Sequence, residues 1–146
     1  MKIGNREFDT KNHTYIMGIL NVTPDSFSDG GKWNDYDRAM SHVEEMQKSG
    51  CDILDIGGES TRPGHHQISE EEEIARVTPL VESVKKNFDL PVSIDTYKSN
   101  VAEAALLAGA DLVNDIWGFL YDPKMASVVK KYEASCCLMH NRSEAV

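Results

Sequence analysis

The stretch SGCDILDI, residues 49–56, decides the fold, because a related stretch, AGADLVNDI, recurs at residues 108–116. In both, a helical pattern ends at a glycine, and a short apolar run that carries a polar residue follows. A module that repeats in this way is typical of chains built from strand–helix units. The sequence on either side contains further members of the series.

Apolar runs of strand length alternate with helical patterns along the chain. The runs lie at residues 15–20, 51–57, 91–95, 111–116 and 135–140. The helical patterns lie at about 35–49, 69–84, 99–107 and 123–132. Pro79 is expected to kink or split the second helix, and residues 2–9 are expected to form a short hairpin. This alternation predicts parallel strands joined by helices.

A parallel sheet of this kind is either an open doubly wound sheet or a (β/α)8 (TIM) barrel. The first strand-to-helix turn carries neither GxGxxG nor GxxxxGK[ST], which disfavours the nucleotide-binding open sheets. A complete barrel needs eight units and about 250 residues, whereas the chain has 146 residues. We therefore expect an α/β fold in which residues 1–146, with about five strands and four helices, form the N-terminal part of a single TIM-barrel domain.

The composition excludes several classes of function. A net charge of −9 disfavours a nucleic-acid-binding protein, which would carry a basic face. No apolar run approaches the length of a bilayer-spanning helix, and the N-terminus has no apolar segment typical of a secretory signal. Three cysteines without a paired spacing indicate reduced thiols. We expect a cytoplasmic protein that acts on small molecules, without nucleic-acid or membrane partners.

Polar side chains gather where the expected strands end. In a βα fold the reactive groups lie at these ends, and here they include Asn21, Asp95 and Asn114. Asp95 could accept two N–H donors from a planar heterocycle, and Asn114 offers both a donor and an acceptor. Ile116 and Met139 could pack on the flat face of such a ring. A pterin or a guanine would fit, although Asp95 and Asn114 could equally cap helices or brace loops.

Other polar groups have two interpretations each. Asn21 could supply one oxygen to Mg²⁺, or stabilise its loop through an Asx-type turn. The stretch STRPG, residues 60–64, could hold a diphosphate or a carboxylate, or form an ordinary turn with a solvated arginine. Asp55 could line the floor of the pocket or be a paired core carboxylate. The run EEEE, residues 70–73, is interpreted as a solvated helix start.

Three long motifs resemble the dihydropteroate synthase family. They are GILNVTPDSFSDGG at 18–31, GCDILDIGGESTRPG at 50–64 and SIDTYKSNVAEAALLAGADLVNDI at 93–116. The resemblance implies a pterin-binding TIM barrel that condenses a dihydropterin-methyl diphosphate with para-aminobenzoate in folate synthesis. It also implies Mg²⁺ as cofactor, a homodimer for the full-length enzyme, and sulfonamides as competitors at the aminobenzoate site.

The resemblance also implies a role for each matching residue. Asn21 matches the Mg²⁺ ligand, and Asp95 and Asn114 match the residues that bind the pterin edge. Thr61 and Arg62 match residues that contact diphosphate and aminobenzoate. Phe27 and Pro63 match the apolar walls around the aminobenzoate ring. Asp29 matches the loop acid that faces the cationic intermediate. Asp29 and Arg62 are the candidate catalytic residues.

The family pattern continues beyond the last residue of this sequence. Its later strands supply a second pterin-binding aspartate, a lysine and an Arg-x-His pair, for which this sequence has no counterpart. We therefore expect the isolated chain not to turn over at a useful rate. Two alternatives remain: a pterin-binding domain that moves a methyl group from a methyl-folate to a corrinoid protein, and a truncated, non-catalytic remnant. The loops at 23–31 and 60–64 disfavour the methyltransferase, which has no use for a diphosphate site.

Overall fold

The computed structural model describes residues 1–22, 32–60 and 66–140. Seven strands and four helices lie within this part of the chain. They are β1 (Lys2–Ile3), β2 (Arg6–Glu7), β3 (Met17–Asn21), α1 (Lys32–Lys48), β4 (Ile53–Gly57), α2 (Glu70–Asn87), β5 (Val92–Asp95), α3 (Ser99–Leu107), β6 (Leu112–Asp115), α4 (Met125–Lys131) and β7 (Ser135–Leu138). The strand–helix alternation and the N-terminal hairpin expected from the sequence are confirmed.

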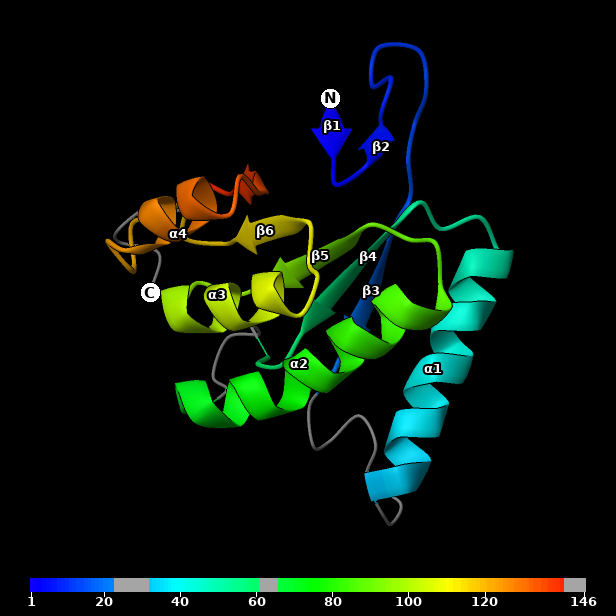
Figure 1. The fold of residues 1–146 in the computed structure, drawn as a ribbon, viewed down its shortest axis with the longest axis horizontal. Helices are drawn as coiled ribbons and strands as arrows, with labels where there is room; N and C mark the ends of the chain where they lie inside the picture. Colours follow the sequence, from blue (N-terminus) through cyan, green and yellow to red (C-terminus); the bar gives the residue numbers. More distant parts are fainter. Residues whose placement is uncertain (23–31, 61–65, 141–146) are drawn as a thin grey trace.

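The main sheet has five parallel strands in the order β3-β4-β5-β6-β7. This order follows the sequence without a reversal, whereas a doubly wound sheet would reverse at a switch point. Figure 1 shows α1, α2, α3 and α4 following one another in an arc along the sheet. In the wall of a TIM barrel, neighbouring strands and their helices follow one another in space in the order of the chain, as they do here.

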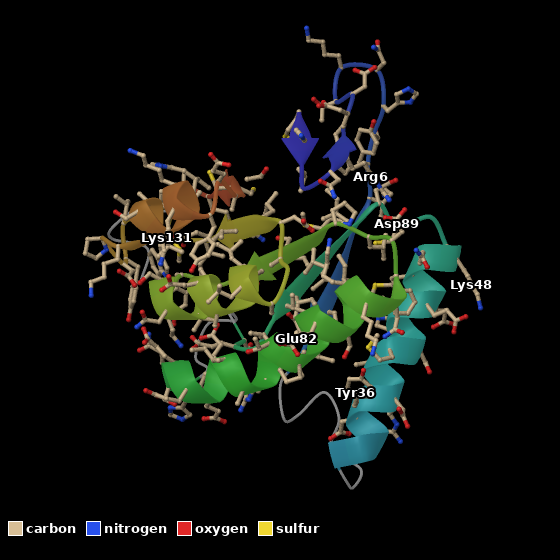
Figure 2. All side chains as sticks on the ribbon, viewed as in Figure 1. Arg6, Tyr36, Lys48, Glu82, Asp89 and Lys131 are labelled. Carbon is tan, nitrogen blue, oxygen red and sulfur yellow. The ribbon has the colours of Figure 1, made fainter. Side chains whose placement is uncertain are left out.

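The core between the sheet and the helices is apolar. It is formed by alternate residues of the strands and by the inner stripe of each helix, including Leu54, Ile56, Ile94, Val77, Val81 and Val113. Tyr36 of α1 donates its hydroxyl to Ser83 Oγ of α2 at 2.6 Å, which ties these neighbouring helices together (Figure 2). No helix in the described ranges is long and apolar enough to span a membrane.

The hairpin β1–β2 covers the end of the sheet at which the strands begin. Ile3 and Phe8 are fully buried there against Ile53 and Leu112, which lie at the starts of β4 and β6. Arg6 donates to the Asp89 carbonyl oxygen at 2.8 Å, and Figure 2 shows the two residues close together. The hairpin therefore closes this end, and a ligand must approach from the carboxyl ends of the strands.

Pro79 lies inside α2, which runs without a break from Glu70 to Asn87. Of the two expected effects of this residue, the split is wrong, and the kink stays a prediction. A proline removes one helical hydrogen bond at a cost of about 3 kcal/mol. Val77, Leu80 and Val84 are buried on both sides of it, and their packing outweighs that cost.

Replacing Phe8 by alanine should test the hairpin. The ring packs edge-on against Tyr15, with the centroids 4.7 Å apart, and is almost completely buried. Its removal should lower the free energy of unfolding by about 3 kcal/mol, as for other buried phenylalanines. Urea denaturation measures the change, with Leu120→Ala as the control because Leu120 is 79% exposed. Equal effects of the two substitutions would show that the hairpin does not stabilise the sheet.

Candidate functional site

The strand register aligns three of the candidate residues. Asn21 pairs with Gly57, Gly57 with Asp95, and Asp95 with Asn114 across four neighbouring strands. Directly paired residues of parallel strands project from the same face of the sheet. The three polar side chains therefore form one row at the carboxyl ends of β3, β5 and β6, which we call the polar row.

Gly57 leaves room for its neighbours in this row. A Cβ atom at this position would lie 3.2 Å from Asn21 Oδ1 and 3.4 Å from Asp95 Oδ2. The first distance is shorter than ordinary van der Waals contact, and the second is at its lower limit. A larger residue at position 57 would therefore displace the two side chains. The absence of a side chain allows Asn21 and Asp95 to approach each other over β4.

Asp55 lies on the same face, two residues before Gly57 on β4. It is almost completely buried, and Asn114 donates its Nδ2 to Asp55 Oδ2 at 3.3 Å. Burial raises the pKa of Asp55, and the hydrogen bond from Asn114 offsets part of this effect. The two interpretations of Asp55 thus combine, because it lies on the floor beneath the polar row and is paired there with Asn114.

Asn114 keeps one polar atom unused. Its Oδ1 is buried and has no hydrogen-bond partner among the described residues. Buried polar atoms are nearly always paired in native proteins, and an exception indicates a missing ligand or water. Since the Asp55 carboxylate accepts the amide N–H of Asn114, the Oδ1 is left to accept a hydrogen bond from a bound molecule.

Asp95 is held in an acidic environment. Burial, together with the nearby charges of Asp55, Glu73, Asp115 and Glu59, raises its pKa to about 7. A ligand that donates two N–H groups would stabilise the charged form and lower this pKa again. Asp95 is therefore suited to bind a planar group rich in N–H donors.

The structure also contains a buried ion cluster that the sequence analysis did not identify. Lys98 Nζ lies 2.5 Å from Glu59 Oε2 and 2.7 Å from Glu73 Oε2, and all three side chains are buried. The interpretation of residues 70–73 as a solvated helix start is wrong for Glu73. The apolar stripe of α2 that contains Val77, Val81 and Val84 reaches Glu73 one turn earlier, and this periodicity could have indicated its burial.

Within this ion cluster, hydrogen bonds between the charged groups oppose the effect of burial on their pKa values. Burial would raise the pKa of Glu59, but hydrogen bonds from Lys98 and Tyr97 outweigh it and lower the pKa. Burial would lower the pKa of Lys98, but its bonds to Glu59 and Glu73 outweigh this and raise it. For Glu73 burial is dominant, and its pKa is raised. Lys98 is therefore held charged between the two carboxyl groups.

Other predicted site residues lie at the border of the polar row or outside the described residues. Ile116 follows β6 and is half-buried, and Met139 follows β7 and is 50% exposed. Met139 N donates to the Asp115 carbonyl oxygen at 3.1 Å, so the two strand ends lie together. The remaining candidates are outside the described residues: Phe27, Asp29, Thr61, Arg62 and Pro63.

The described residues offer limited means of holding a metal ion. Within residues 1–22, 32–60 and 66–140, no three His, Cys, Asp or Glu side chains are grouped for metal binding. Asn21 is exposed at the end of β3 and has a neutral amide oxygen. One such oxygen fits Mg²⁺ when phosphates and water supply the other ligands.

A parallel sheet that winds as a barrel wall, with a row of polar side chains at the carboxyl ends of its strands, is typical of TIM-barrel enzymes. Residues 17–146 match the pterin binding enzyme family. The chain belongs to this family.

Individual relatives agree with this assignment. The chain is 64% identical to the dihydropteroate synthase of Clostridium beijerinckii over 97% of its own length and 53% of that protein. It superposes with a TM-score of 0.90 on the Clostridium difficile dihydropteroate synthase crystallised with pteroic acid, at 55% identity, over 94% of this chain and 52% of the other.

A third match is the Xanthomonas albilineans dihydropteroate synthase with 4-aminobenzoic acid. Its TM-score is 0.85 at 41% identity, over 92% of this chain and 49% of the other. The chain therefore spans about half the length of the relatives it matches.

Asp95→Asn should change how stability depends on pH. The folded pKa of about 7 lies above the ordinary value of 3.8, so the folded chain retains a proton that the unfolded chain has lost. Stability should fall as the pH rises from about 4 to about 7, by about 2–4 kcal/mol from Asp95 alone. The variant should show a smaller fall, to which Asp55 and Glu73, whose pKa values are also raised, still contribute. Urea denaturation at pH 5 and pH 8 measures it.

The control for this experiment is Asp89→Asn, because the Asp89 side chain is fully exposed. This variant should retain the pH dependence of the wild-type chain. Parallel stability curves for wild type and Asp95→Asn would contradict the acidic environment described for Asp95.

Proposed function

We propose that the chain is the N-terminal part of a dihydropteroate synthase. The complete enzyme condenses 6-hydroxymethyl-7,8-dihydropterin diphosphate with para-aminobenzoate, and the products are 7,8-dihydropteroate and diphosphate. The observation that carries the proposal is the polar row, because it presents hydrogen-bond acceptors side by side at the open end of the barrel wall. Membership of the pterin binding enzyme family supports it.

Asp95 and Asn114 bind the pterin edge in this proposal. The edge of an amino-pyrimidinone ring carries adjacent N–H donors, which match the Asp95 carboxylate and the unpaired Asn114 Oδ1. The hydrogen bond from Asn114 to Asp55 leaves that oxygen available. Ile116 and Met139 contact the faces of the ring.

The diphosphate is placed at the rim, away from the buried carboxylates. Asp55 and Asp95 make the floor acidic, and their charge repels an anion. Asn21 contributes one ligand to Mg²⁺, and Thr61 and Arg62 bind the leaving diphosphate. When bound, Mg²⁺ neutralises charge on that leaving group.

The reaction breaks the bond between the pterin methyl carbon and the diphosphate oxygen. The resulting pterin-methyl cation is attacked by the amine of para-aminobenzoate, which then loses a proton. Asp29 stabilises the cation, while Phe27 and Pro63 hold the aromatic ring and exclude water. The acidic floor favours a cation for the same reason that it disfavours diphosphate. No covalent bond to the protein is required.

The same proposal includes the compartment, the oligomeric state and the pathway of the complete enzyme. It acts in the cytoplasm as a homodimer in folate biosynthesis, and sulfonamides compete with para-aminobenzoate. Diphosphate release distinguishes this reaction from methyl transfer to a corrinoid protein, which releases none.

The isolated 146-residue chain should form no dihydropteroate at a useful rate. The chain spans about half the length of its relatives. The family resemblance implies that later strands supply further residues of the site. The assay supplies both substrates and Mg²⁺ and measures dihydropteroate and diphosphate. The full-length relative from Clostridium beijerinckii is the positive control. Turnover comparable to that control would contradict the prediction.

Asn114→Leu should weaken pterin binding by the chain at least about tenfold, since it removes one acceptor and its polar contact with Asp55. Calorimetry with 6-hydroxymethylpterin measures the affinity. Asn100→Leu is the matched control, because Asn100 is exposed on α3, where its amide donates to Glu70 Oε2 at 2.7 Å. Equal affinities of wild type and Asn114→Leu would remove Asn114 from the pterin site.

A further inference from the structure

Asp55 is a buried carboxylate without a cation partner. No lysine, arginine or histidine in the described ranges forms an ion pair with it. Its neighbours in β4, Leu54 and Ile56, are fully buried apolar residues. Burying a charged group costs free energy unless the group is paired. Packing alone therefore does not explain a carboxylate at this position.

The contact between Asp55 and Asn114 sets the orientation of the Asn114 amide. Asn114 donates its Nδ2 to Asp55 Oδ2 at 3.3 Å, and this bond favours the charged form of Asp55. A charged carboxylate accepts hydrogen bonds and cannot donate them. The opposite orientation would place Asn114 Oδ1 against Asp55 Oδ2, and two buried acceptors cannot satisfy each other. Asp55 therefore keeps the Oδ1 atom of Asn114 turned away from itself.

With this orientation, the polar row presents acceptors side by side on β5 and β6. Asp95 is the direct register partner of Asn114 on the neighbouring strand. Its carboxylate adds two acceptor oxygens to Asn114 Oδ1, which is buried and has no hydrogen-bond partner among the described residues. Three neighbouring acceptors match a ligand edge that carries three N–H donors.

Such a set of acceptors distinguishes a 2-amino ring from a 2-oxo ring. In an amino-pyrimidinone the exocyclic amino group carries two N–H donors, and the ring nitrogen beside it carries a third. A 2-oxo analogue has a carbonyl oxygen in place of the amino group, and this oxygen would face the acceptors. A site built to bond a substrate N–H rejects an analogue that lacks it, because buried polar groups of the site are then left unpaired.

We propose that Asp55 is a positioning residue that sets the specificity of the site for a 2-amino ring over its 2-oxo analogue. It acts through Asn114, whose amide it holds with Oδ1 available to the ligand, rather than on the ligand directly. The inference rests on the proposed function for the identity of the ligand. For the orientation of the amide it rests on the contact between Asp55 and Asn114.

Asp55→Asn tests the specificity, because it keeps the shape of the side chain and adds a donor. The new amide can donate to Asn114 Oδ1, so the Asn114 amide can turn and present Nδ2 to a carbonyl oxygen. Calorimetry measures the affinities of the 146-residue chain for 6-hydroxymethylpterin and for its 2-oxo analogue, 6-hydroxymethyllumazine. The ratio of the two affinities should be at least about 100 for the wild-type chain and should fall about tenfold in the variant.

Asp115→Asn is the matched control for this experiment. Asp115 is fully buried on β6, and its charge also acts on Asp95. Its carboxylate accepts the backbone N–H groups of Trp117 and Phe119, both at 2.9 Å, and does not hold the Asn114 amide. The substitution removes a comparable buried charge, so it should change both affinities alike and keep the wild-type ratio.

Hydrogen exchange of the Asn114 side-chain amide, followed by NMR without ligand, tests the orientation by itself. In the wild-type chain this amide should exchange at least about tenfold more slowly than the amide of Asn100, which is exposed. Asp55→Leu removes the acceptor and should accelerate the exchange of the Asn114 amide about tenfold, with Asn100 unchanged.

The outcomes separate this inference from the proposed function. An unchanged affinity ratio in folded Asp55→Asn, or an equal fall in Asp55→Asn and Asp115→Asn, would overturn the specificity role. Unchanged exchange of the Asn114 amide in Asp55→Leu would overturn the orienting contact. An absence of pterin binding by the wild-type chain, with exchange that depends on Asp55, would count against the proposed function and support the orienting contact.

Discussion

The register of the parallel sheet is the constraint on which the site depends. Asn21, Gly57, Asp95 and Asn114 occupy equivalent positions on four strands, and this places the three polar side chains on one face. A slip of one residue would turn a side chain to the helix-covered face. The apolar residues between them, such as Ile56 and Ile94, would then leave the core. Core packing and ligand binding therefore specify the same register.

The site concentrates like charges that do not favour folding. Asp55 and Asp95 lie on one face of the sheet. Burial raises the pKa of Asp95 to about 7, and the nearby charges of Asp55, Glu73, Asp115 and Glu59 add to this effect. Lys98 compensates part of this charge through its bonds to Glu59 and Glu73. In the proposed function, the N–H donors of a bound pterin would stabilise the charged form of Asp95 and offset the cost of burying it.

The sequence predicted most of this wall, since local periodicity and turn chemistry agree with the final fold. Counting along the strands was sufficient to align Asn21, Asp95 and Asn114, because alternation is a local property. Pro79 and Glu73 were misjudged for a common reason: their surroundings are supplied by other elements. The packing around α2 retains Pro79 in the helix, and Lys98, 25 residues later, makes the burial of Glu73 possible. Neither partner is visible from a local pattern.

The strand on which each candidate site residue lies indicates whether further strands of a barrel would pack beside it. Asp95 lies on the central strand β5, with Asn114 beside it on β6, and both have sheet neighbours on either side. Asn21 and Met139 belong to the edges of the sheet, where Ile19 and Leu138 are 60% and 48% exposed. A closed barrel would cover these edges with further strands. In the proposed function, Asp95 and Asn114 therefore take part in the pterin site from positions supported on both sides within this chain, whereas Asn21 and Met139 lie at edges that further strands of a closed barrel would cover.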